Sequence, residues 1–267
     1  MKLKHLSTCI GLVATSAIAF SAESARADDS KFFSFTQGDN LGTCGALVDD
    51  LTTPLFKAFI DDTLLKECKT ADDFFTLTAS DPVDGFLQGK MVDEDEFVKG
   101  VGITVPGEGP VPAEIQAGEL LTATLDKASV IDFIELSFLY RPGVFGDKVF
   151  EVAQITTDTG LMGSLEITGE SSATWSLGGV VSNLDLSKEV EGGYYRIDNP
   201  FGDINISSLL FTAPTEGNRP PTDSDYALVA IGATPGDIAD PIPEPAALLG
   251  LTVVGGLMAA SRRKKAS

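Results

Sequence analysis

Carboxylates are the side chains with which this sequence could most readily do chemistry. Its 267 residues contain 39 Asp and Glu against 19 Lys and Arg. Clustered carboxylate oxygens suit calcium. The candidate ligands are Asp93 and Asp95, Asp198 and Asp203 with the nearby Asn199 and Asn205, and Asp223 and Asp225. None of the three groups follows the twelve-residue calcium-loop pattern, so a solvated acidic turn stays the alternative at each.

Histidine chemistry is excluded from most of the chain. His5 is the only histidine, and it lies in an N-terminal segment that we expect to be removed. The remaining chain therefore lacks a Ser-His-Asp triad, a Cys-His pair and a histidine zinc site. No glycine-rich phosphate loop follows a strand. We expect a non-enzymatic protein; the alternative is a glycan-active enzyme that uses two carboxylates about 5–9 Å apart.

Aromatic side chains could bind sugars if they are exposed. The candidates are Trp175, Tyr194 and Tyr195. Trp175 lies in an alternating stretch and is expected in the core. Tyr194 and Tyr195 must point to opposite faces of a strand, so at most one of them is exposed.

The cysteines predict one disulfide. Cys9 lies in the N-terminal apolar segment, which leaves Cys44 and Cys68. In an oxidising compartment these two should pair. The closed loop of about 25 residues would stabilise the fold by roughly 3 kcal/mol in the chain-entropy model.

The first 27 residues have the pattern of a secretory signal peptide. Lys2 and Lys4 precede an apolar run at 6–20, and the segment ends in Ala25-Arg26-Ala27. This charged, apolar and A-x-A order is typical of a signal peptidase substrate. We expect the mature chain to begin at Asp28.

The last residues combine a proline-rich motif, an apolar run and a basic cluster. Pro243-Glu244-Pro245 is followed by the uncharged stretch 246–260 and then by Arg262, Arg263, Lys264 and Lys265. This tail resembles the PEP-CTERM sorting signal of bacterial exported proteins. The resemblance implies recognition by an exosortase-like membrane transpeptidase, a transient inner-membrane anchor, and delivery to the cell surface or extracellular space. A plain C-terminal membrane anchor is the alternative, and the basic end would lie on the cytoplasmic side.

These patterns divide the chain into five segments. They are the signal peptide 1–27, an acidic ectodomain 28–233, a linker with the PEP motif 234–245, a hydrophobic sorting or transmembrane helix 246–261, and a basic cytoplasmic tail 262–267. Residues 28–245 retain 12 of the 19 Lys and Arg and 38 of the 39 Asp and Glu, a formal charge of about −26. A surface this acidic excludes nucleic acid as a partner.

The ectodomain reads as a mainly β, antiparallel sandwich or jelly roll with one short helical unit near its N-terminus. Apolar residues at steps of three and four predict a helix from about Pro54 to Glu67. Alternation of apolar and polar residues at 134–140 predicts a half-buried strand. The expected strands are 31–36, 74–79, 97–105, 120–125, 130–140, 149–156, 164–168, 173–177, 180–186, 194–197, 204–212 and 226–231.

Together these features predict an exported, non-enzymatic protein of the cell surface or extracellular matrix. The resemblance of the tail implies association with exopolysaccharide. A calcium-dependent adhesin and a carbohydrate-binding module are the alternatives that also need no enzymatic chemistry.

Overall fold

The computed structural model describes residues 30–47, 65–80, 85–92, 95–105, 113–144, 148–184, 193–214 and 224–236. Thirteen strands make up nearly all the regular structure of these residues, with one 3₁₀ helix, η1 (Gly42–Leu47). The strands are β1 (Lys31–Ser34), β2 (Glu67–Lys69), β3 (Phe75–Ser80), β4 (Phe86–Val92), β5 (Asp95–Thr104), β6 (Leu120–Leu139), β7 (Val152–Thr157), β8 (Met162–Ile167), β9 (Ala173–Trp175), β10 (Val180–Asn183), β11 (Gly193–Asp198), β12 (Asn205–Thr212) and β13 (Ala227–Pro235).

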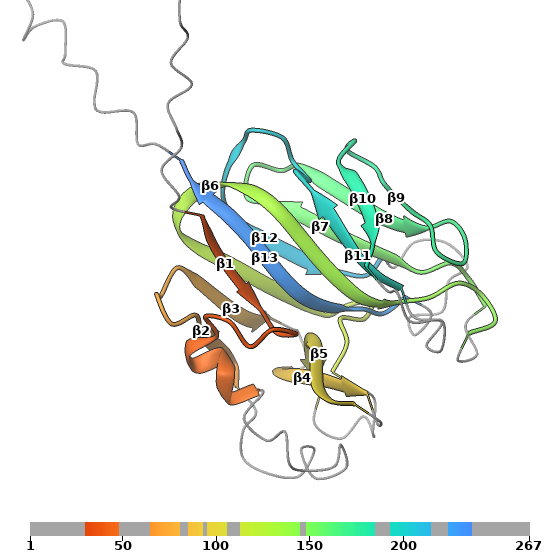
Figure 1. Ribbon diagram of the computed structural model, residues 1–267, viewed down its shortest axis with the longest axis horizontal. Coiled ribbons are helices and arrows are strands. Elements are labelled where there is room, and N and C mark those ends of the chain that lie inside the picture. Colours follow the sequence, from red (N-terminus) through yellow and green to blue (C-terminus); the bar gives the residue numbers. More distant parts are fainter. Residues whose placement is uncertain are drawn as a thin grey trace, which may run out of the picture.

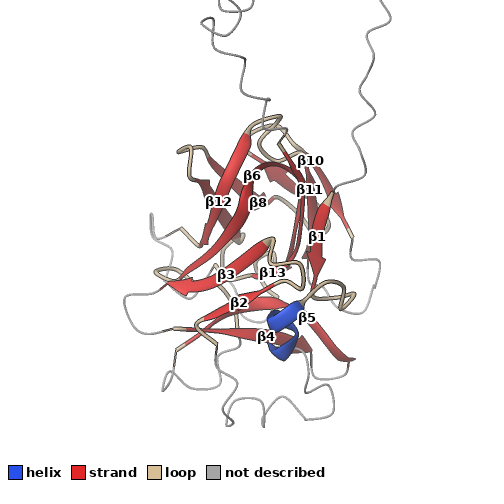
Figure 2. Cartoon of the chain, turned by 90° about the vertical axis from the view of Figure 1, so that its left-hand side faces the viewer, coloured by secondary structure: helices blue, strands red, loops and turns tan. Residues whose placement is uncertain are grey.

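One continuous sheet contains all thirteen strands, and the long strand β6 organises it. Near its start β6 pairs with β3 and β12, and near its end it pairs with β13 and β11. The sheet therefore has two walls that share β6. The first wall runs β2-β3-β6-β12-β7-β8-β9, and the second runs β4-β5-β13-β6-β11-β10 with β1 on β13. Figure 1 shows β6 curving across the molecule, and Figure 2 shows β12 and β8 opposite β1, β10 and β11.

The open edges of this sheet are mostly covered. At one end the Leu87 N–H donates to the Leu65 carbonyl oxygen at 2.7 Å, which joins the edge strand β4 to the segment just before β2. At the other end β10 lies against β9, where the Asn183 amide donates to the Ser171 carbonyl. The Asn40 side chain donates to the carbonyl of Phe32 on β1. Covered edges protect a sheet from pairing with other chains.

Alternation along the strands places one apolar core between the walls. In the second wall, Val181, Ile197, Ile134, Ile231 and Phe33 form one row across five strands, because each is the register partner of the next. The last four are buried, and Val181 packs against them. The first wall contributes Leu77, Leu121, Ile155, Leu165 and Leu209 to the same core. Successive residues on these strands must point away from it.

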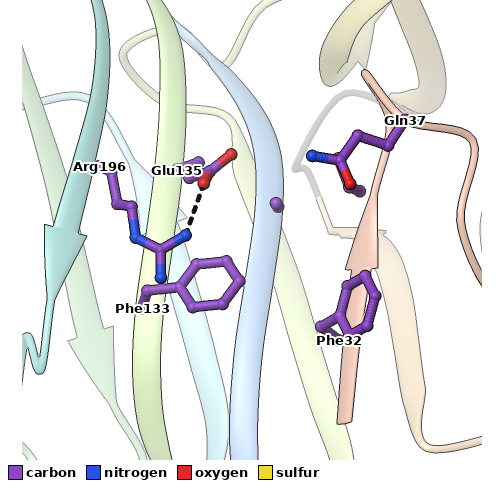
Figure 3. Close-up of a pocket in the computed structure, with 7 residues that line it drawn as sticks. Phe32, Gln37, Phe133, Glu135 and Arg196 are labelled. Atoms are coloured by element: carbon purple, nitrogen blue, oxygen red, sulfur yellow. Dashed lines mark hydrogen bonds and ion pairs between the residues drawn. The ribbon is translucent and has the colours of Figure 1, made fainter. Parts of the chain in front are cut away.

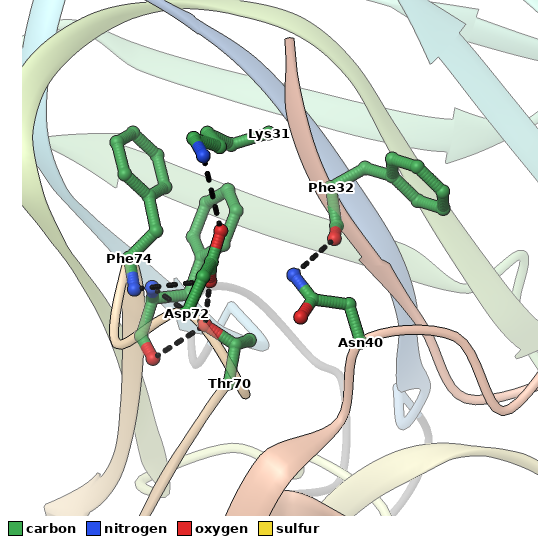
Figure 4. A network of polar contacts seen from close by, with 7 residues as sticks. Lys31, Phe32, Asn40, Thr70, Asp72 and Phe74 are labelled. Atoms are coloured by element: carbon green, nitrogen blue, oxygen red, sulfur yellow. Dashed lines mark hydrogen bonds and ion pairs between the residues drawn. The ribbon is translucent and has the colours of Figure 1, made fainter. Parts of the chain in front are cut away.

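The β2–β3 turn is tied to β1 by a polar network (Figure 4). Asp72 accepts hydrogen bonds from the Thr70 hydroxyl at 2.9 Å and from the Phe74 N–H at 3.2 Å, and it forms an ion pair with Lys31 at 3.5 Å. Burial raises the pKa of Asp72. The contacts with Thr70, Phe74, Asn40 and Lys31 lower it by more, so the pKa lies below its ordinary value. The network joins the first strand to the hairpin.

The prediction of a mainly antiparallel β protein is confirmed. The finer prediction was two packed sheets, whereas the strands that the structure describes form one continuous sheet. Jelly-roll connectivity stays a prediction. Residues 120–125 and 130–140 were expected as two strands, but residues 120–139 form the single strand β6.

The predicted helix over 54–67 is wrong at its C-terminal end, and residues 54–64 lie outside the described residues. Leu65 forms a β-bridge, and Glu67 begins β2. Cys68 is buried between the exposed side chains of Glu67 and Lys69. This alternation has the period of a strand, because Cys68 is paired with Leu77 of β3.

The strand predicted over residues 134–140 is present as part of β6 up to Leu139, but the prediction that only one of its faces is buried is wrong. The intervening residues Glu135, Ser137 and Leu139 are at most 7% exposed. Neighbouring strands cover the second face, since Arg196 and Tyr194 contact Glu135, and β5 approaches Ser137 at Gly100.

Candidate functional site

The outer face of the second wall carries polar and aromatic side chains in two rows. Because successive strand residues alternate, the rows lie on either side of the inner row through Ile134. One row contains Val180, Asp198, Phe133, Gly232 and Phe32, and the other contains Ser182, Arg196, Glu135, Ala230 and Ser34. Both rows cross β10, β11, β6, β13 and β1 in that order.

A hollow of about 230 Å³ lies on this face over β13, and we call it the β13 groove. It is lined by Phe32, Ser34, Gln37, Phe133, Glu135, Arg196 and Ala230. Its floor is low because β13 presents only Ala230 between the larger side chains of β6 and β1, while the Phe133 ring lies over Gly232. Figure 3 shows Arg196, Glu135 and Phe133 on one side of β13, with Gln37 and Phe32 on the other.

Arg196 is fixed by two carboxylates and one ring. Its Nε lies 2.7 Å from Asp198 and its Nη1 lies 3.0 Å from Glu135. The guanidinium carbon lies 3.7 Å from the centre of the Phe133 ring, which is cation–π geometry. Burial lowers the pKa of Arg196, but Asp198 and Glu135 raise it more, so the guanidinium stays charged.

Tyr194 supports the same cluster from β11. Its hydroxyl donates a hydrogen bond to Glu135. Burial first, and then the contact with Glu135, raise the pKa of Tyr194 well above its ordinary value. The phenol therefore stays protonated and holds Glu135 in place.

The predicted sugar-binding aromatics occupy three different environments. Trp175 is a core residue, as expected: it is 4% exposed, donates to the Pro200 carbonyl at 2.8 Å and packs edge-on against Phe201. Tyr195 is buried, while Tyr194 is partly exposed on the opposite face of β11. The prediction that the two side chains point to opposite faces of a strand is confirmed. None of the three lines the β13 groove.

The predicted calcium ligands are not brought together in the part of the chain that the structure describes. There, no three His, Cys, Asp or Glu side chains form a group that could hold a metal ion. Asp198 is engaged by Arg196, and Asp203 lies in the β11–β12 loop. Asp225 precedes β13, and the backbone of Asp95 begins β5. Asp93 and Asp223 lie outside the described residues, so calcium binding stays a prediction.

The predicted disulfide between Cys44 and Cys68 is present. Both cysteines are 1% exposed, and the bond joins η1 to β2. The sorting motif residues Pro243, Glu244, Pro245, Arg262, Arg263, Lys264 and Lys265 lie outside the described residues, as do the signal peptide and the tail helix. Within the described ranges, no helix is long and apolar enough to cross a membrane.

Sequence reasoning missed the residues that form the β13 groove. Phe32, Gln37, Glu135 and Arg196 come from segments up to about 165 positions apart. Only the succession of Phe32 and Phe33 in an expected strand hinted that one aromatic ring of the first strand faces outward.

Comparison with known proteins found no matching family model, no matching curated protein and no matching solved structure.

Proposed function

We propose that this chain is an exported, non-enzymatic protein of the cell surface or extracellular matrix, sorted through a PEP-CTERM-like tail and associated with exopolysaccharide. The observation that carries the proposal is the order of Pro243-Glu244-Pro245, the uncharged run 246–260 and the basic cluster 262–265. Signal peptidase and an exosortase-like transpeptidase are the processing partners that this order implies.

Two properties of the described residues support export. The Cys44–Cys68 disulfide suits an oxidising compartment. The covered sheet edges suit a protein that must stay soluble outside the cell without chaperones. An antiparallel sandwich related to a jelly roll is the finer fold that we propose for this ectodomain.

The environment of the acidic residues supports a non-enzymatic role. Glu135 and Asp198 lie near each other on the outer face, but both are engaged by the same arginine. Carboxylates that cleave a glycosidic bond must instead face each other across the substrate.

The intact mass of the protein isolated from its own cells tests the sorting proposal. We expect a polypeptide that begins at Asp28 and has lost the segment after Pro245. A mass that retains the chain through Ser267 would indicate a protein that stays anchored, and the sorting proposal would then fail.

A substitution sharpens this test. Replacing Pro243, Glu244 and Pro245 by alanine should leave signal-peptide removal intact and abolish loss of the tail. The matched control replaces Pro220 and Pro221, which stand more than twenty positions before the motif, and should be processed normally.

A further inference from the structure

We propose that the β13 groove binds one ring of a neutral sugar within an extracellular polysaccharide, with Phe32 as the stacking platform. This inference rests on the proposed matrix association and assigns it a site. Sequence reasoning placed sugar binding at Trp175, Tyr194 or Tyr195, and the geometry moves it to a different set of residues.

The shape of the groove suits a small ring. Ala230 keeps the floor low, while Phe133 and Arg196 lie on one side of β13 and Phe32 lies on the other. The volume of about 230 Å³ lies below the roughly 300–1,000 Å³ of sites for drug-sized ligands. A single sugar ring of a longer chain, with its neighbours extending along the open groove, fits this size.

The chemistry of the lining suits the two kinds of surface on a sugar. The C–H face of a sugar ring is apolar and packs on aromatic rings, and Phe32 is 42% exposed at the edge of the groove. The hydroxyl groups around the ring need planar polar partners. The exposed Gln37 amide and the fixed Glu135 and Arg196 side chains supply donors and acceptors along the same hollow.

The charge of the site favours a neutral sugar over an acidic one. Arg196 is matched by the two carboxylates of Glu135 and Asp198, so the cluster carries a net charge of about −1. Residues 28–245 carry a formal charge of about −26. Both charges repel uronic acid or sulfated polysaccharides.

Binding can be measured by titration calorimetry on the full-length protein in a detergent without a sugar headgroup. The probes are neutral oligosaccharides of glucose, mannose, galactose, xylose and N-acetylglucosamine, with oligogalacturonate as the anionic counterpart. We expect at least one neutral probe to bind at millimolar concentration and the anionic probe not to bind. Absence of binding by every neutral probe, or binding of oligogalacturonate alone, would overturn the proposal.

Substitutions locate the binding at the groove. Phe32→Ala and Gln37→Ala should each weaken it about tenfold or more, as expected for central contacts of a small site, whereas Phe32→Trp should retain it. Phe150→Ala is the matched control, because Phe150 is equally exposed at 39% but does not line the groove. Equal sugar affinity for Phe32→Ala and wild type would contradict the assignment of sugar binding to the β13 groove. The sorting proposal is tested by intact mass and the sugar-binding proposal by calorimetry. Either proposal can therefore fail without the other.

Discussion

At the scale of single residues, Gly232 and Gly163 of the sheet each lie directly under an aromatic ring. A Cβ atom on Gly232 would lie 2.1 Å from Cε1 of Phe133, and one on Gly163 would lie 2.0 Å from Cζ2 of Trp175. In both cases the aromatic ring occupies the space that a Cβ atom of the glycine would fill. Phe133 in turn supports Arg196, so a glycine on β13 helps to shape the groove.

Gly163→Ala should destabilise the protein by about 1–3 kcal/mol, because the added methyl group forces Trp175 from its packed position. Urea unfolding followed by tryptophan fluorescence would measure the loss, since Trp175 is the only tryptophan. Gly45→Ala is the control: its Cβ would meet nothing closer than 3.7 Å. Equal midpoints for Gly163→Ala and wild type would contradict the close approach.

Tyr226→Phe should cost about 1 kcal/mol of unfolding free energy, because the Thr212 carbonyl loses the hydrogen bond that the hydroxyl donates. The Tyr226 hydroxyl donates to Thr212 at 2.9 Å and is 3.3 Å from the Gln154 carbonyl, and the side chain is fully buried. Tyr194→Phe should cost less, because Tyr194 is partly exposed and Glu135 keeps Arg196 as a partner. Denaturant midpoints compare the two, and a larger loss for Tyr194→Phe would contradict the argument.

The candidate site shows how far residue types alone could lead. The roles of Trp175 and of the tyrosine pair followed from strand alternation. The groove could not be predicted, because it depends on the lateral order β11-β6-β13-β1. That order brings Arg196, Glu135 and Phe32 together, and only the long-range pairing of strands determines it.

At the scale of elements, the disulfide joins η1 to β2 within the buried core. Reduction, or the double substitution Cys44→Ser and Cys68→Ser, should lower the free energy of unfolding by about 3 kcal/mol in the chain-entropy model. Unfolding curves with and without reductant give the value for wild type. The double variant is the control, because reductant should not change its curve. A reductant effect of equal size in the variant would show that another group is responsible.

The Asp72 network should make the attachment of β1 sensitive to acid. Because the pKa of Asp72 is lowered in the folded state, its stabilisation is fully present above the unfolded-state value of about 3.9 and is lost as the pH falls through the folded-state pKa. The difference in unfolding free energy between wild type and Asp72→Asn should therefore shrink as the pH falls from about 5 to about 2. A difference that stays constant over this range would contradict the assignment.

Asp73→Asn is the matched control for this titration. Asp73 is the next residue of the same turn and has a positive φ of 57°, a conformation that asparagine tolerates well. The hydrogen bonds described for the turn end on Asp72 and Thr70 rather than on the Asp73 carboxylate. This variant should follow the wild-type curve.

Most of the strands were predictable because they carry apolar residues at alternate positions and end at turns. β4 was not predicted, because Gln88, Gly89 and Lys90 at its centre do not have the composition of a strand. This segment is a strand because it pairs with β5. β6 was divided in two because Asp126, Lys127 and Ser129 interrupt its apolar pattern, and residues 126–128 have the composition of a turn. Residues 126–128 are exposed where β6 passes from the first wall to the second. The polar residues in this stretch therefore lie within a continuous strand and not in a turn.

At the scale of the whole molecule, net charge should dominate the response to salt. A formal charge of about −26 over residues 28–245 creates self-repulsion that dissolved ions screen. Sodium chloride should therefore raise the melting temperature. Calcium chloride at the same ionic strength distinguishes general screening from a specific site, because only a bound ion adds stability that saturates with concentration. A melting temperature that falls with sodium chloride would contradict the charge argument.

The start of β1 and the end of β13 lie together at one end of the molecule (Figure 1). Lys31 is paired with Ala233, and the Ser30 and Thr234 hydroxyls are 3.3 Å apart. Beyond Pro235 the chain continues toward the proposed sorting tail. The strand that forms the floor of the groove is thus the strand that leads to the tail.

This arrangement has a mechanical consequence. A pull on the tail acts along β13, which is bonded to β6 on one side and to β1 and β5 on the other. Force along a strand loads these hydrogen bonds together in shear, rather than opening them one after another as in a zipper. A polysaccharide held by Phe32 on β1 and Arg196 on β11 would transmit its drag to β13 through the hydrogen bonds of β1 and β6.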